Sequence, residues 1–183
     1  MRITNAKGKV LLERQGDIAG SDLSGLDLRG AWLEGHSLVY SNLSRSILTS
    51  AKLDDADLSN ACLSDAVLEG VLCMGARFDN AVLRGADLYW ALASKASFCG
   101  ADLTGTDLRG ATLQDADFTG ARLERANFGR DNLNGSTNVE GANFTGANLK
   151  GAFWEGASYN SRTRFPDKFN PESSGMIYRD DGD

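Results

Sequence analysis

The chain has 183 residues, which is the length of one domain with a substantial core. Its composition, with 42% hydrophobic residues, 21 glycines and two prolines, argues against disorder and a helical bundle and favours a turn-rich β fold. A net charge of -6 disfavours direct nucleic-acid binding. The chain has no run of about 18 apolar residues and residues 1–10 lack the apolar stretch of a secretory signal, so we expect a cytoplasmic protein that does not bind membranes.

The first element is predicted within residues 1–15. Arg2–Thr4 and Val10–Leu12 lie on either side of Asn5–Gly8, whose composition is typical of a turn. This pattern predicts a hairpin-like cap at the N-terminus.

A five-residue repeat follows the cap. From Ile18 to Leu133 a bulky apolar residue recurs every five positions, and of these 24 central positions only Cys73 and Ala93 do not hold Leu, Ile or Phe. The residue two places before each central residue is small in most repeats. A period of five fits neither an α-helix nor a flat strand. The chain must therefore turn regularly and direct each bulky residue into one shared interior.

The blocks Ala101–Gly105, Ala111–Asp115 and Ala121–Arg125 resemble the A(D/N)LXX unit of pentapeptide-repeat proteins, and the resemblance covers about residues 16–160. It implies an all-β fold, a right-handed quadrilateral β-helix of about seven coils with four pentapeptides in each. The central residue and the small residue two places before it then point inward, and the other three positions point outward. Coils stack about 4.8 Å apart through ladder hydrogen bonds.

Residues 20 apart lie on the same face of successive coils in such a fold. Phe78, Phe98 and Phe118 should therefore form an aromatic column in the core. Because bulky residues line a solenoid's interior, we interpret this column as packing rather than as a cofactor site.

The repeat is interrupted after Leu133. The next central residue is Val139, and this six-residue step predicts a one-residue register slip at 134–139, with a bulge or small loop. Asp131 occupies a small-residue position just before the slip. We expect its carboxylate to turn toward solvent or to cap backbone N–H groups, because an inward carboxylate would need hydrogen-bond partners.

Residues 161–183 are predicted to form a capping tail, because the terminal coil of a solenoid otherwise exposes its core and unpaired edges. Asn170, Pro171 and Glu172 predict the N-cap and first turn of a short helix. The tail also has apolar residues to cover the last coil, namely Phe165, Phe169, Met176, Ile177 and Tyr178.

No constellation of catalytic or metal-binding residues is evident, so we predict a non-enzyme without a cofactor or metal. His36 occupies an inward small-residue position, which favours a structural role. The spacings of Cys62, Cys73 and Cys99 fit neither a disulfide framework nor a CxxC metal site, and we interpret them as reduced thiols. Aspartates directly before a central Leu belong to the repeat, where they form turn hydrogen bonds.

Acidic residues are concentrated on two adjoining faces of the predicted coil, whereas the other two faces are balanced in charge. A negative rod can compete for a DNA-binding protein by placing charge where phosphates would lie. The resemblance implies that members of the quinolone-resistance branch mimic B-form DNA and bind DNA gyrase or topoisomerase IV. The candidate phosphate surrogates here are Asp17, Asp54, Asp55, Asp57, Asp79, Asp115 and Asp117.

Apolar residues also occupy outward positions, namely Leu72, Met74 and Leu92, with Tyr89 and Trp90 at the preceding corner. The undersized centres Cys73 and Ala93 lie beneath them. In one interpretation the wall dents and Leu72 or Leu92 fills the space, since an unfilled Leu-to-Ala gap costs about 2 to 5 kcal/mol. In the other, these residues form an exposed patch for self-association or for a partner protein.

The sequence therefore predicts a non-enzymatic scaffold, a monomer or homodimer, that presents a rigid, partly acidic surface to an unidentified protein partner. The alternative is a DNA mimic that binds a type II topoisomerase and modulates it or protects it from inhibitors.

Overall fold

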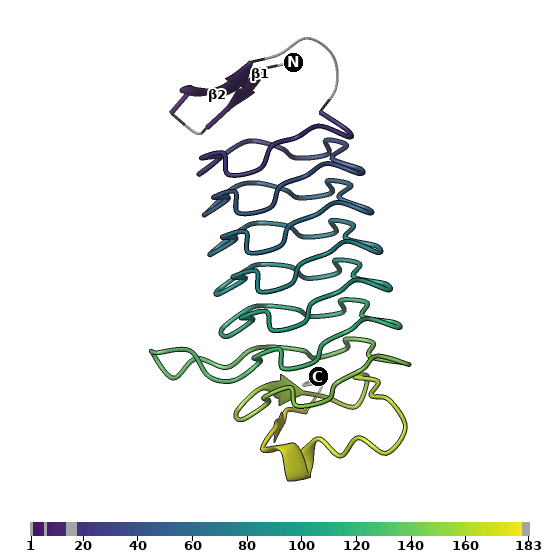
Figure 1. The fold of residues 1–183 in the computed structure, drawn as a ribbon. Helices are drawn as coiled ribbons and strands as arrows, with labels where there is room; N and C mark the ends of the chain where they lie inside the picture. The colour runs from purple at the N-terminus through teal and green to yellow at the C-terminus, as the bar shows by residue number, and fades with distance from the viewer. Residues whose placement is uncertain (1, 6, 14–17, 181–183) are drawn as a thin grey trace.

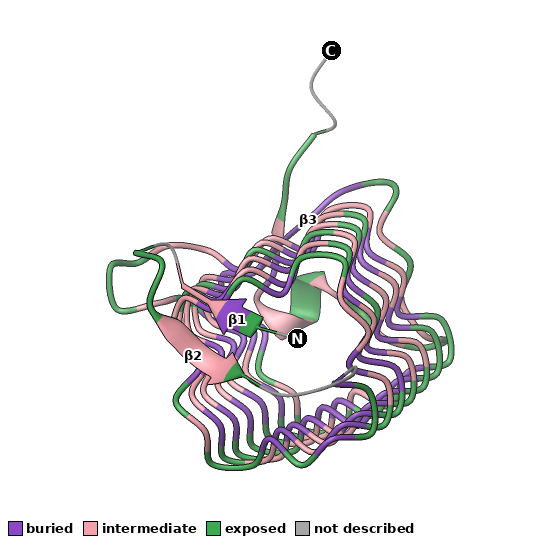
Figure 2. Cartoon of the chain, turned by 90° about the horizontal axis from the view of Figure 1, so that it is seen from above, coloured by how far each residue is buried: buried purple, intermediate pink, exposed green. Residues whose placement is uncertain are grey.

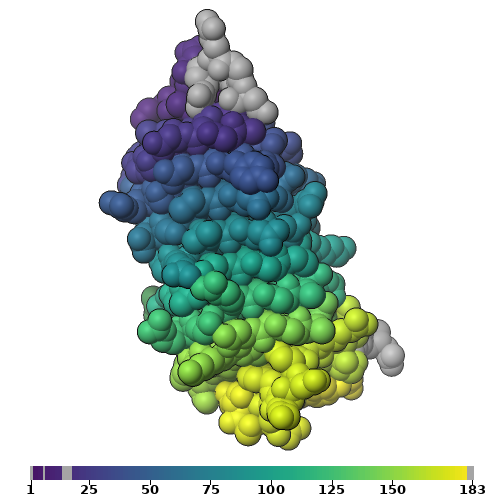
Figure 3. Space-filling view, turned by 45° about the vertical axis from the view of Figure 1, so that its right-hand side comes forward, coloured from purple at the N-terminus to yellow at the C-terminus, as the bar shows by residue number. Residues whose placement is uncertain are grey.

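A computed structural model describes residues 2–5, 7–13 and 18–180, and in it the repeats form a stack of coils (Figure 1). Seen along its axis, the stack has a four-sided outline in which buried residues alternate with exposed ones around each coil (Figure 2). In the space-filling view, residues of similar number form successive bands along a rod (Figure 3). None of the helical segments among the described residues is long and apolar enough to cross a membrane.

Each repeat ends in a tight turn. The N–H of the small residue donates to the C=O of the central residue three places earlier, as from Ser21 to Ile18 at 3.1 Å. The residue before the small residue has a left-handed backbone, with φ of 65° at Gly20 and 56° at Asp55. A positive φ at this third place is typical of a type II turn. Gly, Asn and Asp adopt it with the least strain, which explains why they recur there.

Successive coils are joined by parallel β-bridges between residues 20 apart, as from Asp22 to Asn42 and from Asn42 to Cys62. The N–H of Leu23 donates to the carbonyl of Asn42 at 2.7 Å, and the N–H of Asn42 donates to the carbonyl of Ser21 at 2.9 Å. The same pattern recurs on all four faces. The ladder hydrogen bonds therefore run along the axis of the stack.

The core is a continuous column of central residues and their small companions. Even the undersized centres Cys73 and Ala93 are fully buried. Phe78, Phe98 and Phe118 stack as predicted, with ring centroids 4.9 Å apart at both steps. Each buried side chain of this size contributes about 1.5 to 3 kcal/mol through burial, so the column is a large part of the fold's stability.

The insertion in the last part of the stack is longer than the sequence predicts. Thr112 bridges Asn138, an offset of 26 rather than 20. Val139 therefore takes the core place that the repeat pattern assigns to Leu133, and Leu133 is 75% exposed. The predicted one-residue slip at 134–139 is wrong, because the chain adds six residues between these stacked positions.

The chemistry of Asp131 gives the physical reason. With Leu133 at a centre, Asp131 would point its carboxylate into an apolar core. Residues 129–136, which we call the insertion loop, instead leave the coil and project from the side of the stack (Figure 1). Thr137, fully buried, then supplies the inward polar group, which hydrogen-bonds to backbone.

The hairpin expected at the N-terminus is present. Strand β1 (Arg2–Thr4) pairs antiparallel with β2 (Val10–Glu13), and both lie over the N-terminal end of the stack (Figure 2). The N–H of Trp32 donates to the carbonyl of Thr4 at 2.8 Å, which joins the hairpin to the first coil. Ile3 is 1% exposed and extends the core at this end.

The C-terminal end is covered by the tail. Strand β3 (Ser158–Tyr159) pairs in parallel with β4 (Ile177–Tyr178). The 3₁₀ helix η1 (Glu172–Ser174) lies between them in the chain, and Asn170 Oδ1 accepts from the N–H of Ser173 at 3.0 Å. Phe165 and Phe169 pack against the core.

Candidate interaction surface

One outer face of the stack carries apolar side chains where the repeat usually places polar ones. Trp32, Lys52, Leu72 and Leu92 are joined in sequence by β-bridges, so they lie side by side on successive coils. Trp32 and Leu92 are each 47% exposed and Met74 is 54% exposed, whereas Leu72 is half-buried. We call the residues Trp32, Leu72, Met74 and Leu92 the apolar stripe.

The wall beneath the stripe keeps its ladder. The N–H of Cys73 donates to the carbonyl of Leu92 at 2.9 Å, and the N–H of Ala93 donates to that of Thr112 at 2.8 Å. Because Leu92 stays 47% exposed, it is not drawn into the space above the undersized centres. The stripe is therefore a surface feature of the fold.

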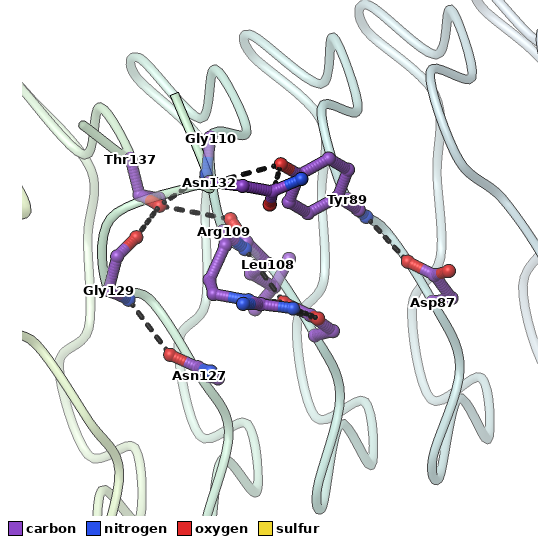
Figure 4. A network of polar contacts seen from close by, with 10 residues as sticks. Asp87, Tyr89, Leu108, Arg109, Gly110, Asn127, Gly129, Asn132 and Thr137 are labelled. Carbon is purple, nitrogen blue, oxygen red and sulfur yellow. Dashed lines mark hydrogen bonds and ion pairs between the residues drawn. The ribbon is translucent and has the colours of Figure 1, made fainter. Parts of the chain in front are cut away.

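Tyr89 and Trp90 lie at the corner that precedes the stripe and contact the insertion loop. The indole Nε1–H of Trp90 donates to Asp131 Oδ2 at 2.6 Å. The hydroxyl of Tyr89 donates to Asn132 Oδ1 and accepts from the N–H of Asn132 at 3.2 Å (Figure 4). The loop is thereby tied to residues about 40 positions earlier, two coils back along the stack.

Asp131 organises the insertion loop from within. Its Oδ1 accepts from the N–H of Leu133 at 2.9 Å and from that of Gly135 at 2.6 Å. The hydrogen bond from Trp90, with those from the backbone, holds the pKa of Asp131 below its usual range. The expectation that this carboxylate caps backbone N–H groups is confirmed.

Gly110 makes the close approach of loop and corner possible. Its φ is +69°, and a Cβ at this place would lie 2.3 Å from Trp90 Cδ1 and 3.0 Å from Asp131 Oδ2. Its N–H donates to the hydroxyl of Thr137 at 3.0 Å (Figure 4). Thr137 in turn lies 3.0 Å from the carbonyl of Leu108, so it fastens the return of the loop to the coil.

The structure thus divides the predicted apolar patch into two parts. Tyr89 and Trp90 bind the insertion loop of the same chain, although Trp90 keeps 38% of its surface exposed. Met74 and Leu92 stay about half exposed, and Leu72 is half-buried. Sequence reasoning missed Trp32, whose signal was an aromatic residue at the same outward position as Leu72, two coils earlier.

Several of the predicted acidic residues are paired with arginine. Arg77 lies 3.8 Å from Asp57 Oδ2 and 3.0 Å from Asp79 Oδ2, and Arg162 lies 2.7 Å from Asp115 Oδ1. Burial raises the pKa of Asp57, but hydrogen bonds from Ser59 and the charge of Arg77 outweigh it and hold the pKa below its usual range. These pairs reduce the negative charge of the two faces.

The other acidic residues differ. Within the described residues Asp54 and Asp55 form no ion pair; Asp54 accepts from the N–H of Met74 at 2.9 Å, and Asp55 is exposed. Asp117 accepts from the N–H of Thr119 at 2.9 Å; burial raises its pKa, but these turn hydrogen bonds hold it below the usual range. Asp17 lies outside the described residues.

Two residues with reactive side chains, Cys73 and His36, lie in different surroundings. Burial raises the pKa of the Cys73 thiol strongly, so it stays protonated. His36 is half-buried, with Nδ1 2.9 Å from the carbonyl of Glu34. Within the described part of the chain, no three His, Cys, Asp or Glu residues are grouped to hold a metal ion.

The profile for pentapeptide repeats matches the chain in eight copies, over residues 21–65, 61–98, 94–130 and 137–158. Full-length QnrB1, described as a plasmid-mediated fluoroquinolone resistance protein, has a TM-score of 0.73 at 19% identity, covering 86% of this chain and 79% of its own. A trypsin-treated variant of QnrB1 has a TM-score of 0.54 at 16% identity, covering 91% of this chain and 88% of its own.

HetL from the cyanobacterium Nostoc sp. strain PCC 7120, a pentapeptide repeat protein involved in heterocyst differentiation regulation, is 26% identical. The match covers 88% of this chain and 86% of HetL, with a TM-score of 0.30. None of the curated protein sequences matches the chain. The QnrB1 structures show the shared fold.

Proposed function

Because this chain belongs to the pentapeptide-repeat family, whose members form right-handed β-helices, we propose that it is a non-enzymatic scaffold that binds another protein. The stack is the rigid support, and the apolar stripe with its acidic border is the binding surface. A fold does not by itself determine what a protein does, so function depends on the side chains that it displays.

The exposure of the stripe carries this proposal. Outward positions of a β-helix face water, and elsewhere in the chain they hold mostly polar residues. Met74 and Leu92 remain about half exposed on neighbouring coils, and Trp32 is half exposed two coils before Leu72, with Lys52 between them. Contiguous exposed apolar side chains of this kind, Trp and Met in particular, are typical of protein interfaces.

The test compares two double variants. Leu72→Ser with Leu92→Ser makes the two leucines of the stripe polar. The matched control is Ile47→Ser with Val67→Ser, since Ile47 and Val67 are half-buried outward residues bridged on another face. Immobilised wild-type protein and control should retain the same partner from an extract of the source cells, which the stripe variant loses. The partner is then purified and the binding measured with isolated components. Equal retention by all three proteins would contradict the proposal.

The second candidate is the DNA mimic that binds DNA gyrase or topoisomerase IV. The likeness to QnrB1 supports it, as do the carboxylates of Asp54 and Asp55, which form no ion pair within the described residues. The pairing of Arg77 with Asp57 and Asp79, and of Arg162 with Asp115, weakens it by neutralising charge on the same faces. We therefore rank it below the apolar interface.

Gyrase supercoiling assays separate the two candidates. Purified protein is titrated with and without a fluoroquinolone, beside a variant in which Asp54 and Asp55 are Asn. The DNA mimic predicts inhibition or drug protection that this variant loses and that weakens as salt rises, because surface charges are screened. No effect at high micromolar protein would exclude this candidate for gyrase.

A further inference from the structure

We infer that the apolar stripe binds a basic, amphipathic α-helix of the partner protein, lying along the axis of the stack. The inference rests on the proposed function and specifies the chemistry of the partner. It follows from three features of the stripe: its satisfied backbone, the spacing of its side chains and the charge of its border.

The backbone beneath the stripe has no free edge for a partner strand. The N–H of Leu72 donates to the carbonyl of Ala51 at 2.9 Å, and the N–H of Leu92 donates to that of Val71 at 2.8 Å. The carbonyl of Leu72 accepts from the N–H of Leu53 at 2.6 Å, and that of Leu92 accepts from the N–H of Cys73 at 2.9 Å, both on the preceding coil. A partner strand gains its affinity from unpaired backbone groups. Recognition on this face must therefore use side chains.

The spacing of the stripe matches a helix better than an extended chain. Side chains on successive coils are about 4.8 Å apart, whereas one turn of an α-helix rises about 5.4 Å. Over the three steps from Trp32 to Leu92, the side chains of a bound helix would move out of line with those of the stripe by only about 2 Å. Side chains on one side of an extended strand are about 6.7 Å apart. Over the same three steps they would move out of line with the stripe by about 6 Å, which exceeds the spacing between two coils. A helix of about 11 residues covers the stripe.

The border of the stripe is more acidic on one side than on the other. Glu34, Asp54 and Asp55 follow its centres, and Lys52 offsets one of these charges, with its Nζ 3.8 Å from Glu34 and 5.3 Å from the centroid of the Trp32 ring. On the other side, at the preceding corner, Arg29 and Glu69 carry opposite charges that cancel. The helix should therefore carry Lys or Arg along one flank.

The same charges argue against a second copy of the chain as the occupant. Each copy has a net charge of -6, so two copies repel each other, and a contact between antiparallel stacks would also bring the two acidic borders together. Lys95 lies beyond Leu92 and changes the sign of the border only at that end. The basic flank is thus expected beside Trp32 and Leu72.

The test uses a display library of random 16-residue peptides selected on the wild-type protein. We expect enriched peptides with apolar residues at positions i, i+4, i+7 and i+11 and with Lys or Arg on one flank. Circular dichroism of a synthesised peptide should show helix on binding. Enrichment of acidic or aperiodic peptides, or no enrichment, would overturn the inference.

Variants then locate the binding site of an enriched peptide. Its affinity, from fluorescence anisotropy, should fall at least tenfold with Leu72→Ser and Leu92→Ser and less than twofold with Ile47→Ser and Val67→Ser. Asp54→Asn with Asp55→Asn should weaken a basic peptide several-fold and leave its Lys→Gln form unchanged. Equal affinity for stripe variant and control would overturn the inference.

The outcome separates this inference from the proposed function. If the stripe variant loses a cellular partner but no helical peptide is enriched, the interface stands and the helix is wrong. If the partner is retained by every variant and no peptide depends on the stripe, both are wrong. Thermal unfolding of each variant confirms that the coils remain folded.

Discussion

The regular coils and the insertion loop are held by different forces. In the coils, most leucine and phenylalanine side chains at central positions are fully buried, and every face has a backbone ladder. The insertion loop has no buried apolar residue of its own, and Leu133 is 75% exposed. Its position depends on hydrogen bonds from Trp90, Tyr89 and Gly135.

This difference implies that the two regions respond to different substitutions. A change in the core should lower the stability of the whole stack, because each coil depends on its neighbours. A change at the loop's anchor should release the loop and leave the stack folded.

The largest effect is expected from the aromatic column. Phe118→Ala removes a fully buried ring that stacks on Phe98 and on Phe144, and it should lower the free energy of unfolding by about 3 to 5 kcal/mol. Leu133→Ala changes a residue that occupies the same place in the five-residue pattern but lies in the loop. It should change the free energy by less than about 0.5 kcal/mol. Urea unfolding measures both, and a similar loss for both would contradict the core place given to Val139.

A smaller loss of unfolding free energy is expected from the ion cluster around Asp102, on the face opposite the apolar stripe. Asp102 is 8% exposed, and its Oδ2 lies 2.5 Å from Arg84 Nε and 3.1 Å from Arg122 Nη2. Asp102→Asn keeps the shape but leaves both arginines without their carboxylate. Because the arginines are half exposed, we expect a loss of about 1 to 2 kcal/mol in urea unfolding. A change in the free energy of unfolding below about 0.3 kcal/mol, roughly RT/2, would show that water replaces the carboxylate as the partner of both arginines.

A smaller effect is expected from acidification, to which Asp102 contributes within the coils. Burial raises the pKa of Asp102, but hydrogen bonds from Thr104 and Arg84 and the charge of Arg122 outweigh it and hold the pKa below its usual range. A carboxyl of this kind stabilises the fold above its ordinary pKa of about 3.9, and this contribution is lost as the pH falls below that value. The free energy of unfolding should therefore decline below about pH 4, less steeply in Asp102→Asn. A rise in stability on acidification would contradict this assignment.

The smallest effect on global stability, and the sharpest test of the comparison, is expected from Trp90→Asn. Trp90 has a left-handed φ of 56°, which Asn adopts with less strain, so the coils should keep their unfolding midpoint. The indole that binds Asp131 is lost, and amide exchange of residues 131–135 should accelerate about tenfold. Hydrogen exchange measured by NMR reports both regions. A fall in the unfolding midpoint of the coils with unchanged amide exchange in the loop would contradict the prediction that Trp90 anchors the loop and not the stack.

The regular coils could be predicted from sequence because one side-chain rule repeats along the chain. Even Cys73 and Ala93 obey it, since their neighbours fix the path of the backbone. The insertion could not be sized in this way. Leu133 follows Phe128 at the spacing of one more repeat. In the structure, however, Thr137 and Val139 occupy the inward positions of the next coil, and the five-residue spacing alone does not predict this.

The candidate site was only partly accessible from sequence for a related reason. The outward places of Leu72, Met74 and Leu92 follow from the repeat. The partners of Tyr89 and Trp90 do not, because the residues that they bind lie about 40 positions later, in a segment outside the repeat. Ion pairs such as Asp115 with Arg162 join the stack to its tail and are equally invisible to a periodic pattern.

The direction of the ladder hydrogen bonds has a mechanical consequence. Tension applied along the rod pulls on these bonds end to end, so a terminal coil can peel away a few bonds at a time instead of shearing a whole face at once. Resistance to stretching then depends on the end segments, the β1–β2 hairpin and the β3–β4 pair, which must detach before unwinding can begin. Bending the rod, by contrast, compresses a close-packed interior. The molecule is therefore expected to resist bending more strongly than it resists stretching along its axis.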